Sequence, residues 1–297
     1  MSRDTAKKSS VILAVFCLAG SLCIGDEEKG LKNEFFAMDT GTIDANHSTA
    51  ESQVAMLKEL GYAGLAYWEG NPKKGNCGLK EMLNELDKAG LKIYPLYVGV
   101  WLDEGKPKYE EGLPEAIKLL KGRNAGIWLH IMSEKFGKSS SDGDERAVQI
   151  VREVADMAHE SGAWVALYPH VNEWMERHDD ALRVAKKVNR RNVGVSFNLF
   201  HRLKIEGEVG IDQQLEQLKP YLFTVTINGS SKAGSIDTLD KGDFDVYGLL
   251  KKLEKLGYTG PIGLQGWGIK GDVHENLKRS MQAWKEFNTR LAEEQSQ

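Results

Sequence analysis

The chain has 297 residues, of which 41% are hydrophobic and 28% are charged, and its formal net charge is −4. These values are typical of one large globular domain or two small ones, and they exclude a disordered chain, a collagen and a coiled coil. No run of basic residues occurs, so nucleic acid, whose phosphates need a basic surface, is not an expected partner.

Residues 1–25 have the pattern of a secretory signal peptide. Arg3, Lys7 and Lys8 precede an apolar stretch over residues 11–25, and small residues close that stretch. The stretch is short for a membrane-spanning helix, which needs about 20 residues. We therefore expect an exported, periplasmic protein. The alternative is an uncleaved leader that tethers the protein to a membrane.

Eight short apolar runs recur along the rest of the chain. Their mean spacing is about 32 residues, close to the length of one strand-loop-helix-loop unit. We predict strands over residues 34–39, 63–68, 92–98, 126–131, 163–168, 193–198, 222–228 and 261–265.

Helical patterns lie between these runs. In residues 49–61, Val54, Leu57 and Leu60 fall on one stripe, and Gly61 stands where a helix C-cap is expected. Three further amphipathic segments end in the same way, at Gly90, Gly162 and Gly257.

Alternation of strands with helices implies parallel strand pairing, and continuously apolar strands imply burial on both faces. Eight such units predict a single (β/α)8 barrel over residues 30–290, followed by a flexible tail at 291–297. An open, doubly wound sheet is the alternative. No glycine-rich phosphate-binding motif follows any run, so nothing indicates a nucleotide-binding fold.

The barrel predicts where chemistry takes place, because active sites of such barrels lie at the carboxyl ends of the strands. Candidate bases near those ends are His170, His201 and Glu69. Aromatic faces with amide and imidazole donors suit a sugar ring. On that ground the expected substrate-binding residues are Trp68, Tyr97, His130, Tyr168, Asn198, Asn228, Lys232, Gln265 and Trp267.

Three segments resemble the xylose isomerase-like barrels, the sugar phosphate isomerase/epimerase family. They are VALYPH (165–170), VGVSFNLFH (193–201) and LDKGDFDVYGLLKKL (239–253). The resemblance implies the barrel fold and a sugar isomerase or epimerase activity. It also implies a divalent metal held by a strand-5 Glu, a strand-6 Asp, a strand-7 His and a strand-8 Glu.

This sequence departs from that ligand set. It keeps His170 and His201 of the family pattern, and His130 matches a strand-4 histidine of some members. The ligand positions themselves carry neutral groups, namely Tyr168, Asn198, Thr226 or Asn228, and Gln265. Magnesium and manganese prefer anionic oxygen ligands. We therefore expect no conventional carboxylate-bound metal, and a zinc ion on the three histidines is the alternative.

Two functions stay open on this evidence, with the cofactor unknown. The first is an exported isomerase, epimerase or lyase that abstracts a proton next to the carbonyl of a sugar or keto-sugar. The second is a catalytically inactive barrel that binds a sugar or another partner. Metal-dependent phosphoester hydrolysis, as in the apurinic endonucleases of the same family, is disfavoured because the metal ligands and a basic groove are missing.

Overall fold

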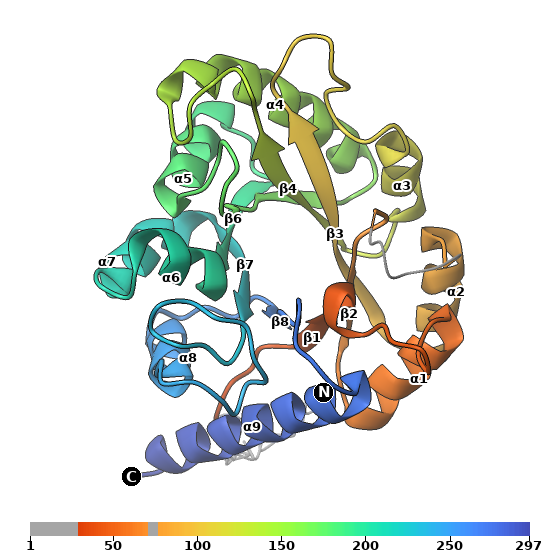
Figure 1. The fold of residues 1–297 in the computed structure, drawn as a ribbon, viewed down its shortest axis with the longest axis vertical. Helices are drawn as coiled ribbons and strands as arrows, with labels where there is room; N and C mark the ends of the chain where they lie inside the picture. The colour runs from red at the N-terminus through yellow and green to blue at the C-terminus, as the bar shows by residue number, and fades with distance from the viewer. Residues whose placement is uncertain (1–28, 71–76) are drawn as a thin grey trace, which may run out of the picture.

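The computed structural model describes residues 29–70 and 77–297, so the predicted signal peptide lies outside the described residues. Eight parallel strands close into a barrel in sequence order, with β8 beside β1 (Figure 1). The strands are β1 (Phe35–Met38), β2 (Gly64–Tyr67), β3 (Lys92–Trp101), β4 (Gly126–Met132), β5 (Trp164–Leu167), β6 (Val193–Asn198), β7 (Leu222–Ile227) and β8 (Ile262–Leu264). The predicted single (β/α)8 barrel is confirmed.

Helices surround the strands on the outside (Figure 1). They are α1 (Ala50–Leu60), α2 (Leu79–Ala89), α3 (Leu113–Leu119), α4 (Asp144–Glu160), α5 (His178–Val188), α6 (Leu199–Glu206), α7 (Ile211–Leu218), α8 (Val246–Lys255) and α9 (Val273–Glu294). Single 3-10 turns occur at Asp39–Gly41, Ser141–Gly143 and Lys219–Tyr221. In the part of the chain that the structure describes, no helix is long and apolar enough to cross a membrane.

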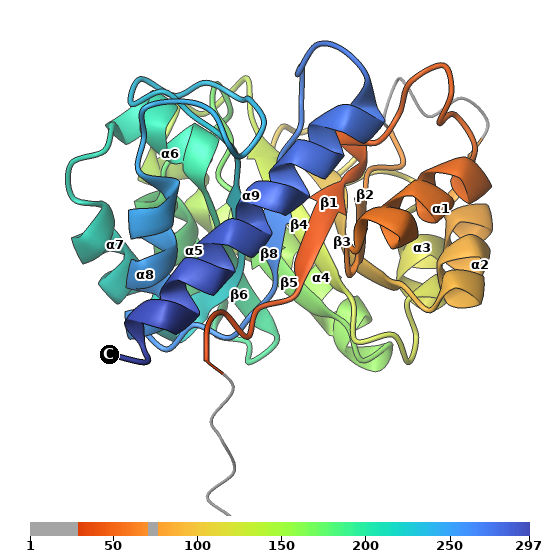
Figure 2. The ribbon, with the colours of Figure 1, turned by 90° about the horizontal axis from the view of Figure 1, so that it is seen from below.

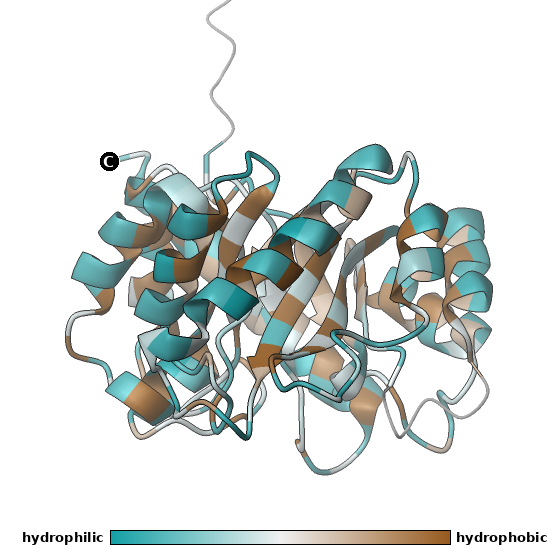
Figure 3. Cartoon of the chain, turned by 90° about the horizontal axis from the view of Figure 1, so that it is seen from above, coloured by the Kyte–Doolittle hydropathy of each residue, from teal (hydrophilic) through white to brown (hydrophobic). Residues whose placement is uncertain are grey.

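Local chemistry explains where α1 begins and ends. The Thr49 hydroxyl accepts a hydrogen bond from the Ser52 N–H at 3.1 Å and caps the first turn. At the other end Gly61 has φ 88°, a left-handed conformation that glycine adopts without steric cost. Between these residues Val54 and Leu57 are buried against the barrel. The helices as a group turn hydrophobic residues inward and hydrophilic residues outward (Figure 3).

The inside of the barrel is filled by side chains. Its core contains Phe36, Met38, Ala66, Tyr94, Trp128, Ala166 and Tyr168. Trp128 is fully buried, and its indole N–H donates to the Thr224 hydroxyl at 2.8 Å. A closed core of this kind means that a ligand binds above it, at one end of the barrel, and does not pass through.

Two segments differ from the prediction. Strand β3 continues to Trp101, because its pairing with β4 extends to Met132. At the other end of the sequence, residues 291–294 belong to α9, within the stretch that we expected to be a flexible tail. Gly30 then donates its N–H to Oε1 of Gln295 at 2.6 Å. The first described residues and the C terminus thus lie together at the amino-terminal end of the barrel (Figure 2).

Candidate active site

A cavity of about 450 Å³ opens at the carboxyl ends of the strands. Residues that follow β1, β2, β5 and β8 line it, together with side chains on β3, β4 and α6. The polar and aromatic lining residues include Asp39, Trp68, Tyr97, His130, Tyr168, His170, Glu173, His201, Gln265 and Trp267. Within residues 29–70 and 77–297, no Lys or Arg lines this cavity.

The backbone of Val171 fixes the protons of two neighbouring histidines. Its carbonyl oxygen lies 2.9 Å from Nδ1 of His170, and its N–H donates to Nδ1 of His201 at 3.3 Å. Because a carbonyl only accepts and an N–H only donates, neutral His170 carries its proton on Nδ1 and His201 carries its proton on Nε2. The two ring centroids are 4.2 Å apart. A lone pair on Nε2 of His170 is therefore presented beside an N–H on His201.

Burial favours the neutral form of both imidazoles by lowering the pKa of each. It lowers the pKa of His170, an effect that the Glu173 carboxylate opposes and His130 reinforces. It holds the pKa of His201 well below its ordinary value, and the nearby histidines add to that effect. The His170 side chain is still 31% exposed and lines the cavity, where a ligand can reach it. Nε2 of His201 is buried and has no hydrogen-bond partner among the described residues.

Glu173 lies between two imidazoles. Both of its carboxylate oxygens are 2.9 Å from Nδ1 of His130, and Oε1 is 3.1 Å from Nδ1 of His170. The loop after β5 turns back to bring Glu173 here, because Asn172 adopts φ 69° and Met175 donates its N–H to the Ile131 carbonyl oxygen. One carboxylate in this position orients both rings and stabilises one positive charge on either of them.

A neutral hydrogen-bonded cluster forms the floor of the cavity. Oδ1 of Asn198 accepts a hydrogen bond from the backbone N–H of His201 at 2.9 Å and caps α6. This contact turns the Asn198 amide nitrogen toward the barrel axis. That nitrogen lies 2.5 Å from the Tyr168 hydroxyl, 2.6 Å from Oγ1 of Thr226 and 2.7 Å from Oε1 of Gln265. The floor thus takes one residue from each of four strands, at the strand's end or next to it, and it contains no charged group.

Aromatic rings surround the cavity above this floor. Tyr97 stacks on His130 with ring centroids 4.3 Å apart, and the edge of Trp68 meets Tyr97 at 5.9 Å. Trp68 also lies beside Trp267, whose ring is 46% exposed at the mouth. Asp39 holds the backbone of Trp68 in place, since its Oδ2 accepts a hydrogen bond from the backbone N–H of Trp68 at 2.9 Å. Rings in this arrangement offer apolar faces to the C–H groups of a sugar.

A family model described as xylose isomerase-like TIM barrel matches residues 54–287. The chain belongs to this family. Solved structures agree on the fold. An L-ribulose 3-epimerase superposes with a TM-score of 0.72 at 13% identity, covering 89% of this chain and 97% of that chain. No curated protein matches the sequence.

Two further structures with the same fold come from named organisms. D-allulose 3-epimerase from Methylomonas sp., in complex with D-allulose, has a TM-score of 0.68 at 16% identity and covers 87% of this chain and 97% of that chain. The 3-keto-D-glucoside 4-epimerase from E. coli, in its apo form, has a TM-score of 0.66 at 17% identity. It covers 85% of this chain and 98% of that chain. At these identities the likeness concerns the fold.

The residues of this xylose isomerase-like barrel do not fit a carboxylate-bound divalent metal. The family positions carry a phenol, two amides and a hydroxyl, and the Asn198 amide nitrogen occupies their centre as a hydrogen-bond donor. In the described part of the chain, no group of three or more His, Cys, Asp or Glu is arranged to hold a metal ion. The zinc alternative on His130, His170 and His201 therefore finds no support in this arrangement.

Three of the twelve predicted site residues lie away from the cavity, and a fourth, Asn198, lies beneath its lining. Glu69 is exposed, two residues beyond the end of β2. Asn228 is buried, but its amide donates to the carbonyl oxygens of Gly229 and Ser235 within its own loop. Lys232 lies 3.5 Å from Glu208 in an ion pair. The other nine predicted residues include Asn198, which reaches the cavity through its contacts in the floor cluster, and eight that line the cavity directly.

Asp39 and Glu173, the two carboxylates of the cavity, are recognisable from the sequence as residues that follow strands, but sequence reasoning assigned neither of them a role in the site. Asp39 immediately follows β1, so its position at a strand end was a usable signal. Glu173 stands three residues after His170, a spacing that brings the two side chains together only because the loop reverses at Asn172. Nothing in the sequence alone indicates that reversal.

Proposed function

We propose that this xylose isomerase-like barrel is an isomerase or epimerase of unphosphorylated keto-sugars, which transfers a proton at a carbon next to the carbonyl. The observation that carries the proposal is the His170 and His201 pair. A base with a free lone pair and a neutral N–H donor, 4.2 Å apart between ring centroids, are the two groups that enolisation requires.

In this mechanism Nε2 of His170 takes the proton from the carbon next to the carbonyl. The negative charge that develops on the carbonyl oxygen is stabilised by the N–H at Nε2 of His201, which has no other partner among the described residues. A neutral donor suits this step, because it strengthens its hydrogen bond as charge develops without protonating the oxygen prematurely.

Glu173 is a positioning residue in this scheme. It holds Nδ1 of His170 at 3.1 Å and stabilises the imidazolium that forms when His170 takes the proton. Return of that proton to the former carbonyl carbon, with transfer of the neighbouring hydroxyl proton to the former carbonyl oxygen, gives isomerisation. Return of a proton from the opposite face gives epimerisation, and His130, which shares the same carboxylate at 2.9 Å, is the candidate acid.

The cavity favours an uncharged sugar over a sugar phosphate. Two carboxylates, Asp39 and Glu173, line it, and no lining residue among those described is a cation. A phosphate dianion in such a place would be repelled and would lack the donors that normally bind it. An unphosphorylated substrate also suits export of the protein, which we propose on the signal-peptide pattern of residues 1–25.

The test is exchange of solvent deuterium into a panel of ketohexoses, ketopentoses and 3-keto-glycosides, with the matching sugar phosphates alongside. We expect exchange and a new sugar product for at least one unphosphorylated substrate, and none for its phosphate. Loss of water from the sugar in place of isomerisation would assign the lyase reaction instead. Saturable sugar binding with no exchange for any substrate would favour the inactive binding barrel and contradict the proposal.

His170→Asn is the variant for this assay, because it removes the base and keeps a polar side chain of similar reach. It should bind the same sugar and lose exchange. His159→Asn is the matched control, since His159 is exposed in the last turn of α4 and does not line the cavity.

A further inference from the structure

The amino-terminal end of the barrel carries an unusual charge distribution. Among the described residues, the segments that lead into the eight strands at this end contain seven Lys or Arg and one carboxylate, Glu34, while the sequence directly before Lys29 adds Asp26, Glu27 and Glu28. The seven are Lys29, Lys32, Lys121, Arg123, Arg190, Arg191 and Lys219. They are scattered along the sequence, so only the fold collects them. The segments that leave the strands at the catalytic end contain more carboxylates than cations in the described chain.

Most of these cations are not neutralised. Glu34 pairs with Lys92 and with the Tyr94 hydroxyl, so it is already engaged. Arg123 and Arg190 form ion pairs with Asp87 and Asp156 on the flanking helices. The remaining five, Lys29, Lys32, Lys121, Arg191 and Lys219, are exposed and have no ion-pair partner in residues 29–70 or 77–297.

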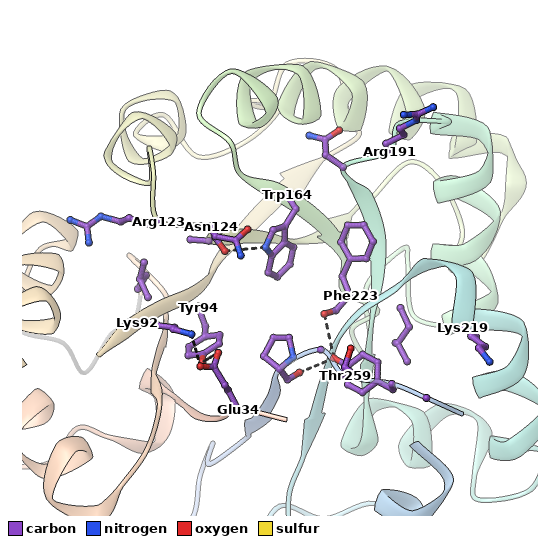
Figure 4. A pocket seen from close by; sticks show the side chains of 18 of the residues that line it. Glu34, Lys92, Tyr94, Arg123, Asn124, Trp164, Arg191, Lys219, Phe223 and Thr259 are labelled. Atoms are coloured by element: carbon purple, nitrogen blue, oxygen red, sulfur yellow. Dashed lines mark hydrogen bonds and ion pairs between the residues drawn. The ribbon is translucent and has the colours of Figure 1, made fainter. Parts of the chain in front are cut away.

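A second cavity, of about 700 Å³, opens at the same end. Figure 4 shows the rings of Trp164, Tyr94 and Phe223 toward its middle, with Arg191 and Lys219 at its periphery. Trp164 and Phe223 meet edge to face with centroids 5.8 Å apart, and both are only partly buried. Partly buried aromatic rings within a cationic rim are typical of proteins that contact the headgroup layer of a membrane.

The chain itself points to the same partner. The described residues begin with Lys29 at this end of the barrel (Figure 2). The 28 preceding residues, which include the apolar stretch 11–25, therefore join the barrel beside the basic rim. In the alternative of an uncleaved leader, the apolar stretch and the polybasic surface are two separate signals that act together at a bilayer; after cleavage the polybasic surface acts alone.

We propose that the amino-terminal end of the barrel is a membrane-contact face for anionic phospholipids. The basic rim binds the headgroups, the aromatic cavity receives part of the headgroup layer, and the catalytic cavity at the opposite end faces away from the bilayer toward dissolved sugars. The proposal is independent of the reaction, because no residue of the catalytic cavity takes part in it.

The test is co-sedimentation of the full chain with large vesicles of phosphatidylglycerol or of phosphatidylcholine at low salt. Arg191→Glu with Lys219→Glu reverses two cations of the rim. Lys80→Glu with Lys270→Glu is the matched control, because it changes the net charge equally at exposed positions of the catalytic end. Any contribution of residues 1–28 is the same in all three proteins.

Each cation near an anionic surface strengthens binding about fivefold. The rim variant should therefore lose about thirtyfold or more in partitioning onto phosphatidylglycerol, and the control should change by less than about threefold. Wild-type binding to phosphatidylglycerol should also weaken steeply with added salt. An equal loss in the two variants, or no loss in either, would overturn the proposal.

Two further experiments distinguish binding of anionic lipid from binding of other anions. Inorganic phosphate at 10 mM and constant ionic strength should leave vesicle binding unchanged; full competition would assign the cavity to a small free anion and overturn the membrane role. Double-stranded DNA should bind the wild type no better than it binds the rim variant. Binding of DNA that exceeds binding of vesicles and depends on the rim would overturn it in favour of a nucleic acid.

Discussion

His170 and His201 lie with their ring centroids 4.2 Å apart and carry their protons on opposite nitrogens, because one residue, Val171, accepts from the first and donates to the second. This arrangement needs no charged group to set the two tautomers. It gives the cavity a base and a neutral donor, because Nδ1 faces a backbone carbonyl oxygen in His170 and a backbone N–H in His201.

The base is the first target for mutation. His170→Asn should lower the rate of proton exchange by about 10² to 10⁴-fold, the usual contribution of a general base. The sugar dissociation constant should change little, because the aromatic rings and the floor cluster remain. Isothermal titration with exchange measured by NMR separates the two quantities. If His170→Asn exchanges at the wild-type rate while His159→Asn also does, His170 is not the base.

Glu173→Gln tests the positioning role through the pH profile. The carboxylate raises the pKa of His170 against the burial that lowers it. Without the carboxylate this pKa falls further, and the base stays neutral to lower pH. The acidic limb of kcat/KM should therefore move to lower pH, while the maximal rate falls because the imidazolium loses its partner. Glu216→Gln, at an exposed position on α7, should leave the limb in place. If the acidic limb of kcat/KM lies at the same pH in Glu173→Gln as in the wild type, Glu173 has only a structural role.

Stability should fall at acid pH through the buried histidines. Burial lowers the pKa of His201 and of His178 below the value of about 6.5 that histidine has in the unfolded chain. The unfolded state then binds more protons than the folded state. These histidines therefore leave the free energy of unfolding at its full value above about pH 6.5 and lower it as the pH falls below that value. Each such group contributes a slope of up to about 1.4 kcal/mol per pH unit.

Urea unfolding at pH 7.5, 6.5 and 5.5 measures that slope. His201→Asn should reduce it, whereas His159→Asn, which changes an exposed ring, should keep it. A His201→Asn slope equal to the wild-type slope would show that His201 is protonated in the folded protein.

The neutral floor predicts independence from divalent metals. EDTA should change neither the melting temperature nor the exchange rate of the wild type, since a donor nitrogen, Nδ2 of Asn198, occupies the centre of a floor that has no carboxylate. Asn198→Asp places an anion where a donor is needed and should destabilise the fold by about 1–3 kcal/mol. Gln213→Glu adds the same charge at an exposed site of α7 and should cost little. A fall in wild-type melting temperature on adding EDTA would contradict this view of the floor.

Trp267 tests the aromatic wall. Its ring is 46% exposed at the mouth beside Trp68, so Trp267→Ala should leave stability nearly unchanged. Loss of one stacking face should raise the sugar dissociation constant about three- to tenfold. Val209→Ala, at an 85% exposed apolar position away from the cavity lining, is the control. Equal affinities for Trp267→Ala and the wild type would remove Trp267 from the binding surface.

The sequence predicted the barrel well, because strand burial and helix caps are local signals. All eight strands occur where apolar runs predicted them, and Thr49 and Gly61 cap α1 as their residue types suggest. The floor was also accessible from sequence, since Tyr168, Asn198, Thr226 and Gln265 each stand at or next to a strand end whose side-chain direction the barrel fixes.

Loops set the limit of that prediction. Asn228 directly follows β7, but the chain doubles back so that Gly229 and Asp237 exchange hydrogen bonds, and the Asn228 amide is used inside the loop. Glu173 enters the cavity only through a reversal at Asn172, in a conformation that few residues other than glycine adopt. Such turns depend on tertiary contacts, which neither periodicity nor spacing reports.

The opposite tautomers of His170 and His201 are the central claim, and nitrogen-15 NMR of the imidazole rings at pH 7 measures them directly. Long-range correlations in histidine-labelled protein, assigned with His170→Asn and with His201→Asn, distinguish the three protonation states of each ring. We predict a proton on Nδ1 alone in His170 and on Nε2 alone in His201. The same tautomer in both rings, or a proton on both nitrogens of either ring, would contradict the account.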